Sequence, residues 1–237
     1  MSAEPAALAR RITAVQERIA LACARAGRER AEVTLIAVSK TQPAAAVRAA
    51  YALGLRDFGE NYAQELRDKA AQLADLHELR WHFIGRLQRN KAQHVIGTAA
   101  LIHTVASSAL IERLAALAAE RGQTQSLLLQ LNLSGEDSKS GARAEELPAL
   151  LAAVDAYPLQ LRGVGLMTMP PLEADPQRAA PIFAALRHLR DGCAGRWATP
   201  ARRGELSMGM SGDYEVAIAE GATLVRVGSA IFGDRAP

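Results

Sequence analysis

The sequence predicts an α/β protein that folds as a single (β/α)8 TIM barrel with an extra N-terminal helix. Eight short apolar runs alternate with helical stretches along nearly the whole chain, as the strands and helices of such a barrel do. The chain has 237 residues, close to the ~250 residues typical of this fold. No linker or low-complexity tract divides it, so we expect one domain over residues 1–237. A doubly wound open sheet has the same alternation and stays open as the alternative.

The first elements are an amphipathic helix and a buried strand. Apolar residues recur at helical spacing between Leu8 and Ile19, and Gly27 follows them. This pattern predicts a helix over residues 5–26. The run at 33–38 is continuously apolar, as expected of a parallel strand that is covered on both faces.

The remaining elements follow from the same alternation. Strands are predicted at residues 55–58, 81–84, 101–104, 126–131, 161–165, 205–208 and 223–227. Helices are predicted at residues 43–54, 88–96, 108–121, 145–156, 176–190, 213–220 and 229–232. One more helix is predicted to open at Asn61, because Asn61 and Gln64 resemble a capping box.

Composition excludes several classes of function. The net charge is +3 and aromatic residues are 4% of the chain, without a basic arm or a basic stretch interleaved with aromatics. We therefore expect no nucleic-acid binding. The chain has no run of about 20 apolar residues and no signal-peptide pattern at its start, so we expect no membrane span and a cytoplasmic location. Cys23 and Cys193 are too few for a disulfide scaffold or a metal site.

Lys40 directly follows the first predicted strand, in the segment Val38-Ser39-Lys40. In a β/α barrel the C-terminal ends of the strands form the active face. Desolvation there lowers the pKa of a lysine amine toward nucleophilic use, which suits a Schiff base with a carbonyl ligand. A solvated lysine at the end of a strand is the simpler alternative.

Two loops that contain glycine and serine follow the last two predicted strands. The first holds Ser211, and the second holds Gly228 and Ser229. Backbone N–H groups at the start of a helix attract a dianion, and barrel enzymes often bind phosphate after strands seven and eight. The loops predict a phosphate site, although tight turns with capping hydroxyls are the simpler alternative.

Arg226 lies inside the last predicted strand, between Val225 and Val227. A buried arginine needs an acceptor, which is either a carboxylate such as Glu60 or Glu205 or a ring nitrogen of a ligand. A lysine for an aldehyde, loops for a phosphate and an arginine for a ring nitrogen together indicate pyridoxal 5'-phosphate (PLP).

Longer segments around these residues resemble the pyridoxal phosphate homeostasis protein family, the single-domain relatives of the alanine racemase barrel. The matching segments, in the family's order, are residues 37–41, 58–65, 81–91, 132–141, 163–167, 206–213 and 225–233. The chain departs from the family at Ala106, where an aspartate is usual, and over 194–203.

The resemblance implies a set of cofactor-binding residues and no metal or catalytic residue. Its members are Lys40, Asn61, His82, Met208, Ser211, Arg226, Gly228 and Ser229. Within this set Lys40 forms the Schiff base with PLP, and Arg226 is the partner of the pyridine nitrogen. Ser211, Gly228 and Ser229 contact the phosphate, while Asn61 and His82 lie near the ring.

We expect a carrier rather than an enzyme, one that holds PLP reversibly and delivers it to PLP-dependent apoenzymes. The resemblance implies that its role is control of free PLP and so of amino-acid pools. An arginine only donates, so it keeps the pyridine nitrogen unprotonated and weakens the ring as an electron sink. The alternative is an amino-acid racemase that uses Lys40 and either Tyr62 or Tyr214 as its two bases. A barrel that binds protein or RNA without a cofactor is the third class. We expect a monomer, in which Lys139 offers a second amine for PLP transfer.

Overall fold

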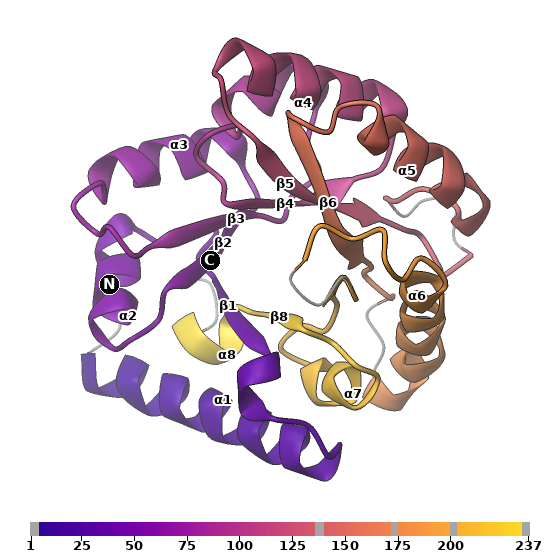
Figure 1. The fold of residues 1–237 in the computed structure, drawn as a ribbon. Coiled ribbons are helices and arrows are strands. Elements are labelled where there is room, and N and C mark those ends of the chain that lie inside the picture. The colour runs from indigo at the N-terminus through magenta and orange to yellow at the C-terminus, as the bar shows by residue number, and fades with distance from the viewer. Residues whose placement is uncertain (1–4, 136–139, 172–174, 200–202, 234–237) are drawn as a thin grey trace.

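The computed structural model describes residues 5–135, 140–171, 175–199 and 203–233. Eight parallel strands form a closed barrel in chain order, and the last strand pairs with the first (Figure 1). The predicted barrel is confirmed, and closure excludes the open doubly wound sheet. The strands are β1 (Thr34–Val38), β2 (Asp57–Glu60), β3 (Arg80–Phe83), β4 (Leu101–Val105), β5 (Gln125–Gln130), β6 (Leu161–Met167), β7 (Glu205–Ser207) and β8 (Leu224–Val227).

Helices surround the barrel and follow the strands in alternation (Figure 1). The α-helices are α1 (Pro5–Arg25), α2 (Ala44–Ala52), α3 (Ala63–Gln72), α4 (Ser108–Glu120), α5 (Leu147–Asp155), α6 (Ala180–Gly192), α7 (Tyr214–Ala219) and α8 (Ser229–Phe232). Short 3₁₀ helices are η1 (Arg30–Glu32), η2 (Arg89–His94), η3 (Ala144–Glu146) and η4 (Pro176–Ala179).

Three local predictions were wrong. The segment at 88–96 forms the 3₁₀ helix η2 rather than an α-helix. Asn61 does not cap α3, because Tyr62 occupies the N-cap position and makes no side-chain cap hydrogen bond. Strand β2 begins at Asp57 instead of residue 55, since the Leu55 N–H still bonds to the α2 carbonyl of Ala50.

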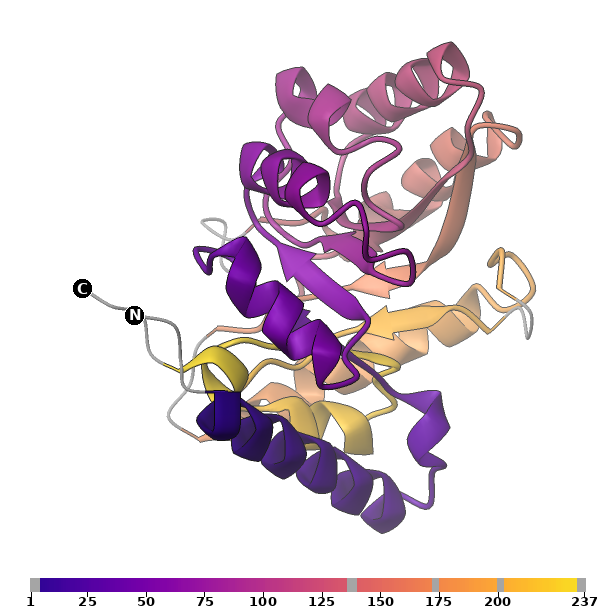
Figure 2. The ribbon, with the colours of Figure 1, turned by 90° about the vertical axis from the view of Figure 1, so that its left-hand side faces the viewer.

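The extra N-terminal helix α1 packs on the outside of the barrel against α7 and α8 (Figure 2). Leu8, Ile12, Val15 and Ile19 form its buried face, as the helical spacing predicts. The Arg11 Nε donates to the Ile231 carbonyl of α8 at 2.6 Å. Helix α1 therefore braces the segment that follows β8.

Apolar packing falls into two clusters. A large one lies between the strands and the helices, and a small one fills part of the barrel interior. The interior cluster consists of Ile36, Leu101, Leu128, Val164, Met167 and Leu224. Both cysteines are free thiols. Within the described ranges, no helix is long and apolar enough to cross a bilayer, and no cluster of His, Cys, Asp or Glu could hold a metal.

Candidate ligand-binding site

A cavity of about 740 Å³ opens at the C-terminal ends of the strands, within the size range of small-molecule sites. Strand β1 places Lys40 in its wall by simple alternation, because every second side chain of a strand faces the same side. Ile36 belongs to the interior cluster, and Val38 and Lys40 line the cavity above it. The lysine therefore continues the inward-facing row of β1.

The adjoining wall comes from the segments after β7 and β8, since β8 pairs directly with β1. Ser211, Gly228 and Ser229 line it, together with Arg226 from inside β8. The Gly228 N–H donates to the Ser211 hydroxyl at 3.2 Å, so the two predicted loops touch each other. This contact places two hydroxyls and a glycine turn on one side of the cavity.

Arg226 is buried but has no carboxylate in hydrogen-bonding contact among the described residues. Its Nη1 donates to the Ser207 hydroxyl at 2.6 Å, and its Nη2 donates to the Thr168 carbonyl at 3.2 Å. Neither Glu60 nor Glu205 is its partner, which corrects that alternative. Burial lowers the pKa of Arg226 to about 10, although Asp213 favours its charged form. At neutral pH the cavity wall therefore carries a buried cation.

Asn61 reaches the cavity because Gly85 lets two loops approach closely. A Cβ on Gly85 would lie 1.9 Å from the carbonyl oxygen of Asn61, a distance that no side chain tolerates. The loops after β2 and β3 therefore touch through their backbones, and both residues line the cavity.

Ser39, the residue before Lys40, belongs to a largely buried group of polar and charged side chains that we call the Lys69 cluster (Ser39, Glu60, Glu65 and Lys69). The Lys69 ammonium donates to the Ser39 carbonyl at 2.6 Å and lies 2.7 Å from Glu60 Oε1 and 2.8 Å from Glu65 Oε1. The Ser39 hydroxyl donates to Glu60 Oε1 at 2.6 Å. The cluster ties the end of β1 to β2 and α3.

Glu60 is the member of this cluster whose hydrogen bonding is incomplete. Its Oε2 is buried and has no hydrogen-bond partner in the described part of the chain. Burial raises the pKa of Glu60, while the nearby Lys69 charge and the hydrogen bonds from Lys69 and Ser39 oppose that shift. Removing either charge of the buried Glu60–Lys69 pair is therefore expected to lower the stability of the folded protein.

Thr41, the residue after Lys40, has a φ of 65°, a left-handed conformation that costs a β-branched residue about 1–3 kcal/mol. Its N–H donates to Glu65 Oε1 at 2.7 Å. The Lys69 cluster thus fixes the backbone on both sides of Lys40, through Ser39 and through Thr41.

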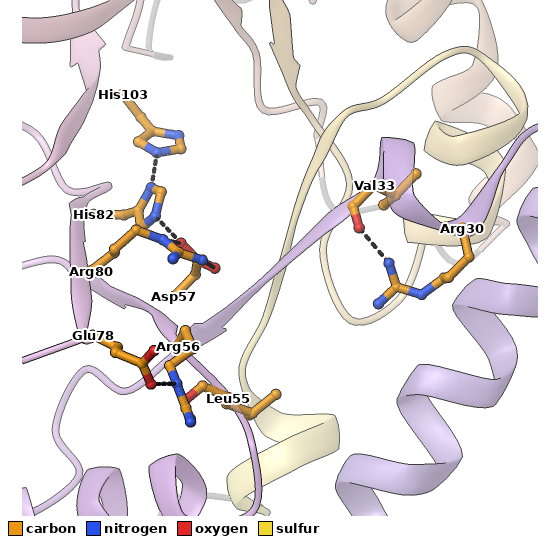
Figure 3. A network of polar contacts seen from close by, with 9 residues as sticks. All are labelled: Arg30, Val33, Leu55, Arg56, Asp57, Glu78, Arg80, His82 and His103. Atoms are coloured by element: carbon orange, nitrogen blue, oxygen red, sulfur yellow. Dashed lines mark hydrogen bonds and ion pairs between the residues drawn. The ribbon is translucent and has the colours of Figure 1, made fainter. Parts of the chain in front are cut away.

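His82 and Met208 do not line this cavity. Met208 faces the outer core, since Ser207 takes the inward position of β7. His82 lies deeper in the barrel, between Asp57 and the buried His103 (Figure 3). The structure brings together all the other residues predicted for the cofactor site.

The two tyrosines considered as racemase bases also lie away from the cavity. Tyr62 is 58% exposed and Tyr214 is buried, and neither lines it. The Tyr214 ring packs beneath the Arg18 guanidinium of α1 at 5.5 Å, so it faces the outer helices. Lys139, the predicted second amine, lies outside the described residues.

Neither Lys69 nor His103 was predicted from the sequence to have a role at the site. Lys69 is on the buried face of α3. In the sequence of this helix it cannot be told apart from a lysine on the solvent-exposed face. His103 is the central residue of β4, which is buried throughout. An ionisable residue inside a largely apolar, buried strand was the available signal, as it was for Arg226.

The fold and site define a class: the chain belongs to the family described as alanine racemase, N-terminal domain, which matches residues 11–236. More particularly, it belongs to the pyridoxal phosphate homeostasis protein family. The member from Pseudomonas aeruginosa is 48% identical over 96% of each chain. The member from Escherichia coli K12 is 41% identical, over 96% of this chain and 97% of its own.

Solved structures agree with this assignment. PipY from Synechococcus elongatus, solved without PLP, has a TM-score of 0.83 and 39% identity, covering 95% of this chain and all of that one. PipY has also been solved with PLP bound, with a TM-score of 0.76. Alanine racemase from Corynebacterium glutamicum shares the fold at 17% identity, with a TM-score of 0.66 over 94% of this chain and 62% of that one.

Proposed function

We propose that this chain binds PLP in the cavity between Lys40 and Arg226, holds it as a reversible Schiff base and acts in PLP homeostasis. The names of the relatives and the PLP-bound structure of PipY support this function. The chemistry of the cavity supports it independently, because its walls offer an amine, a buried cation and a pair of hydroxyls.

The buried charge of Arg226 is the observation that carries the proposal. A guanidinium has five N–H donors, and the two hydrogen bonds to Ser207 and Thr168 are both to neutral groups. A buried cation without a carboxylate partner is costly, and an acceptor supplied by a ligand in the cavity offsets that cost. The unprotonated pyridine nitrogen of PLP is such an acceptor.

The other residues divide the remaining work. Lys40 supplies the amine, and the Lys69 cluster holds the backbone beside it. The hydroxyls of Ser211 and Ser229, with the Gly228 turn, suit the phosphate. Bound PLP would supply an aldehyde that condenses reversibly with an amine. The 740 Å³ cavity opens to solvent beside the half-exposed Met169, which suits release of PLP to an apoenzyme.

The same geometry favours a carrier over the racemase alternative. A racemase needs a second base near the ligand, and Tyr62 and Tyr214 both lie outside the cavity lining. Arg226 donates only, which weakens the PLP ring as an electron sink. We propose that the chain has no racemase role and passes PLP to PLP-dependent apoenzymes.

The purified protein tests this function directly. After loading with PLP and dialysis, we expect a visible absorption band that borohydride abolishes and that an added apoenzyme depletes as the apoenzyme gains activity. In deuterated water, we expect no exchange of the α-proton of alanine. Failure to take up PLP would contradict the binding site, while exchange that needs Lys40 would favour the racemase.

Replacing Tyr214 by phenylalanine gives a second test. The Tyr214 hydroxyl is buried without a partner among the described residues, and such a group costs about 1–3 kcal/mol. We therefore expect unchanged PLP uptake and an unfolding free energy that is equal or higher by about 1 kcal/mol, measured by urea denaturation. A large loss of PLP uptake in this variant would instead place Tyr214 at the ligand.

A further inference from the structure

A chain of hydrogen bonds crosses the barrel interior from its N-terminal end to the cavity, and we call it the Asp57–Arg226 chain. Arg226 Nη1 donates to Ser207 Oγ at 2.6 Å, and that oxygen lies 2.8 Å from His103 Nδ1. His103 Nε2 lies 3.0 Å from His82 Nδ1. His82 Nε2 lies 3.0 Å from Asp57 Oδ1. Figure 3 shows the part from His103 to Asp57.

All five side chains of the Asp57–Arg226 chain are buried, and those of His103 and Ser207 are completely inaccessible to solvent. A buried donor or acceptor without a partner costs about 1–3 kcal/mol. Each contact in the chain must therefore join one donor to one acceptor. That requirement restricts where the protons can be.

The carboxylate end sets the order of the protons. Burial alone would raise the pKa of Asp57, but hydrogen bonds from His82 and Arg80 outweigh it and lower the pKa. Asp57 is thus an acceptor, and His82 carries a proton on Nε2. A neutral His82 then accepts at Nδ1 from His103 Nε2–H.

The order continues to the cavity. His103 accepts at Nδ1, so the hydroxyl proton of Ser207 points at that nitrogen. The lone pairs of the Ser207 oxygen are then left for Arg226. Every donor points from the cavity toward Asp57, and each contact joins one donor to one acceptor.

In the reverse order His82 donates to His103 and His103 donates to Ser207. This order needs a doubly protonated, charged His82 and is disfavoured. The charge of Asp57 is already matched by Arg80, whose Nε and Nη2 donate to it at 2.8 and 2.6 Å. A second buried cation would be added to that of Arg226. The Ser207 oxygen would also receive two donors, and its own O–H would need a third partner. Burial, followed by the neighbouring His82 and the Arg226 charge, lowers the pKa of His103, in keeping with a neutral His103.

We propose that the Asp57–Arg226 chain is a positioning device, in which a single order of protons holds the Arg226 guanidinium in one orientation toward the cavity ligand. His82, His103 and Ser207 act through Arg226 and are positioning residues. The identity of the ligand rests on the proposed function above, whereas the order of the protons concerns the protein alone.

Imidazole ¹⁵N NMR of the protein prepared without PLP tests the proton order. Among its five histidines, we expect His82 and His103 to be neutral Nε2–H tautomers at pH 7, with slowly exchanging N–H protons. The variants His82→Asn and His103→Asn assign the signals. A doubly protonated His82, or an Nδ1–H tautomer of His103, would overturn the proposal.

The variant Ser207→Ala tests the effect on Arg226. In the wild type we expect resolved Nη signals from a guanidinium whose rotation is restricted. In the variant we expect these signals to merge and the dissociation constant for PLP to rise about tenfold, the loss of one hydrogen bond to a charged group. Ser126→Ala, on β5 and outside the chain, is the matched control and should change neither.

These readouts separate the two proposals. Unmerged guanidinium signals and unchanged PLP affinity in Ser207→Ala would refute the positioning role even if PLP binds well. The expected tautomers and guanidinium signals in a protein that takes up no PLP would refute the proposed function, but they would still support the proton order of the Asp57–Arg226 chain.

Discussion

Replacing Lys40 by alanine is expected to abolish covalent retention of PLP and to lower its affinity by at least about a hundredfold, or roughly 2.7 kcal/mol. The expectation follows from position, because Lys40 and the buried Arg226 line the same cavity. Alanine removes both the amine that condenses with an aldehyde and a positive charge. Borohydride trapping followed by peptide mapping measures the loss.

The sequence makes this mapping unusually clear, since its lysines are Lys40, Lys69, Lys91 and Lys139. In the wild type the label should appear on the peptide that contains Lys40. Lys40→Arg keeps the charge but cannot form the bond, so it should regain part of the affinity without any label. Lys91→Ala, at an exposed site on η2, is the matched control. Wild-type levels of trapped PLP in Lys40→Ala would refute the assignment.

Replacing Lys69 by methionine is expected to have the largest effect on stability, about 3–5 kcal/mol of unfolding free energy. The change leaves the buried carboxylate of Glu60 without its cation, and Glu60 already has an unpartnered oxygen. In a chain of this size the loss corresponds to a fall in melting temperature of roughly 6–20 °C. Thermal and urea denaturation measure it.

Two comparison variants make this result specific. Arg67→Ala removes an exposed pair with Asp68 on the same helix, and surface pairs contribute about 0–1 kcal/mol. The double variant Glu60→Gln with Lys69→Met removes both charges and should recover part of the loss. A loss below about 1 kcal/mol in Lys69→Met would show that the buried pair is not needed.

The stability of Lys69→Met should also depend on pH in a defined direction. Burial raises the pKa of Glu60 in the folded protein, and losing Lys69 removes the charge that opposes this. Between the unfolded pKa of about 4.3 and the raised folded value, the folded state binds more protons. Its stability therefore rises as pH falls through that window. A deficit that does not shrink with acidification would contradict a charged Glu60 as its cause.

Much of the site could be predicted from residues at the ends of strands. Lys40, Ser211, Gly228 and Ser229 each lie within four residues of the C-terminal end of a strand, and the C-terminal ends of barrel strands meet on one face. The structure gathers them around one cavity. Asn61 was placed there by resemblance alone, and its loop approaches because Gly85 lacks a side chain.

The face of a strand on which a side chain lies, and its depth in the barrel, were harder to predict than the residues at strand ends. Met208 is one residue beyond the inward-facing Ser207, so it points to the outer core. His82 also faces the barrel interior, but it lies deeper than the cavity lining and bonds to Asp57 and His103. A shift of one residue changes the face of a strand side chain, and a shift of two changes its level.

By itself the sequence determined the β/α alternation, the helix before the first strand, the lysine that follows the first strand and the arginine of the last strand. Each of these depends on local periodicity or on a strand end, which neighbouring residues encode. Only the tertiary structure decided which distant side chains meet. His103 and Ser207 are 104 positions apart, and Lys69 finds the Ser39 carbonyl across 30 positions. Such partners are selected by barrel closure and burial, because a buried polar group must find whichever partner the fold brings within reach.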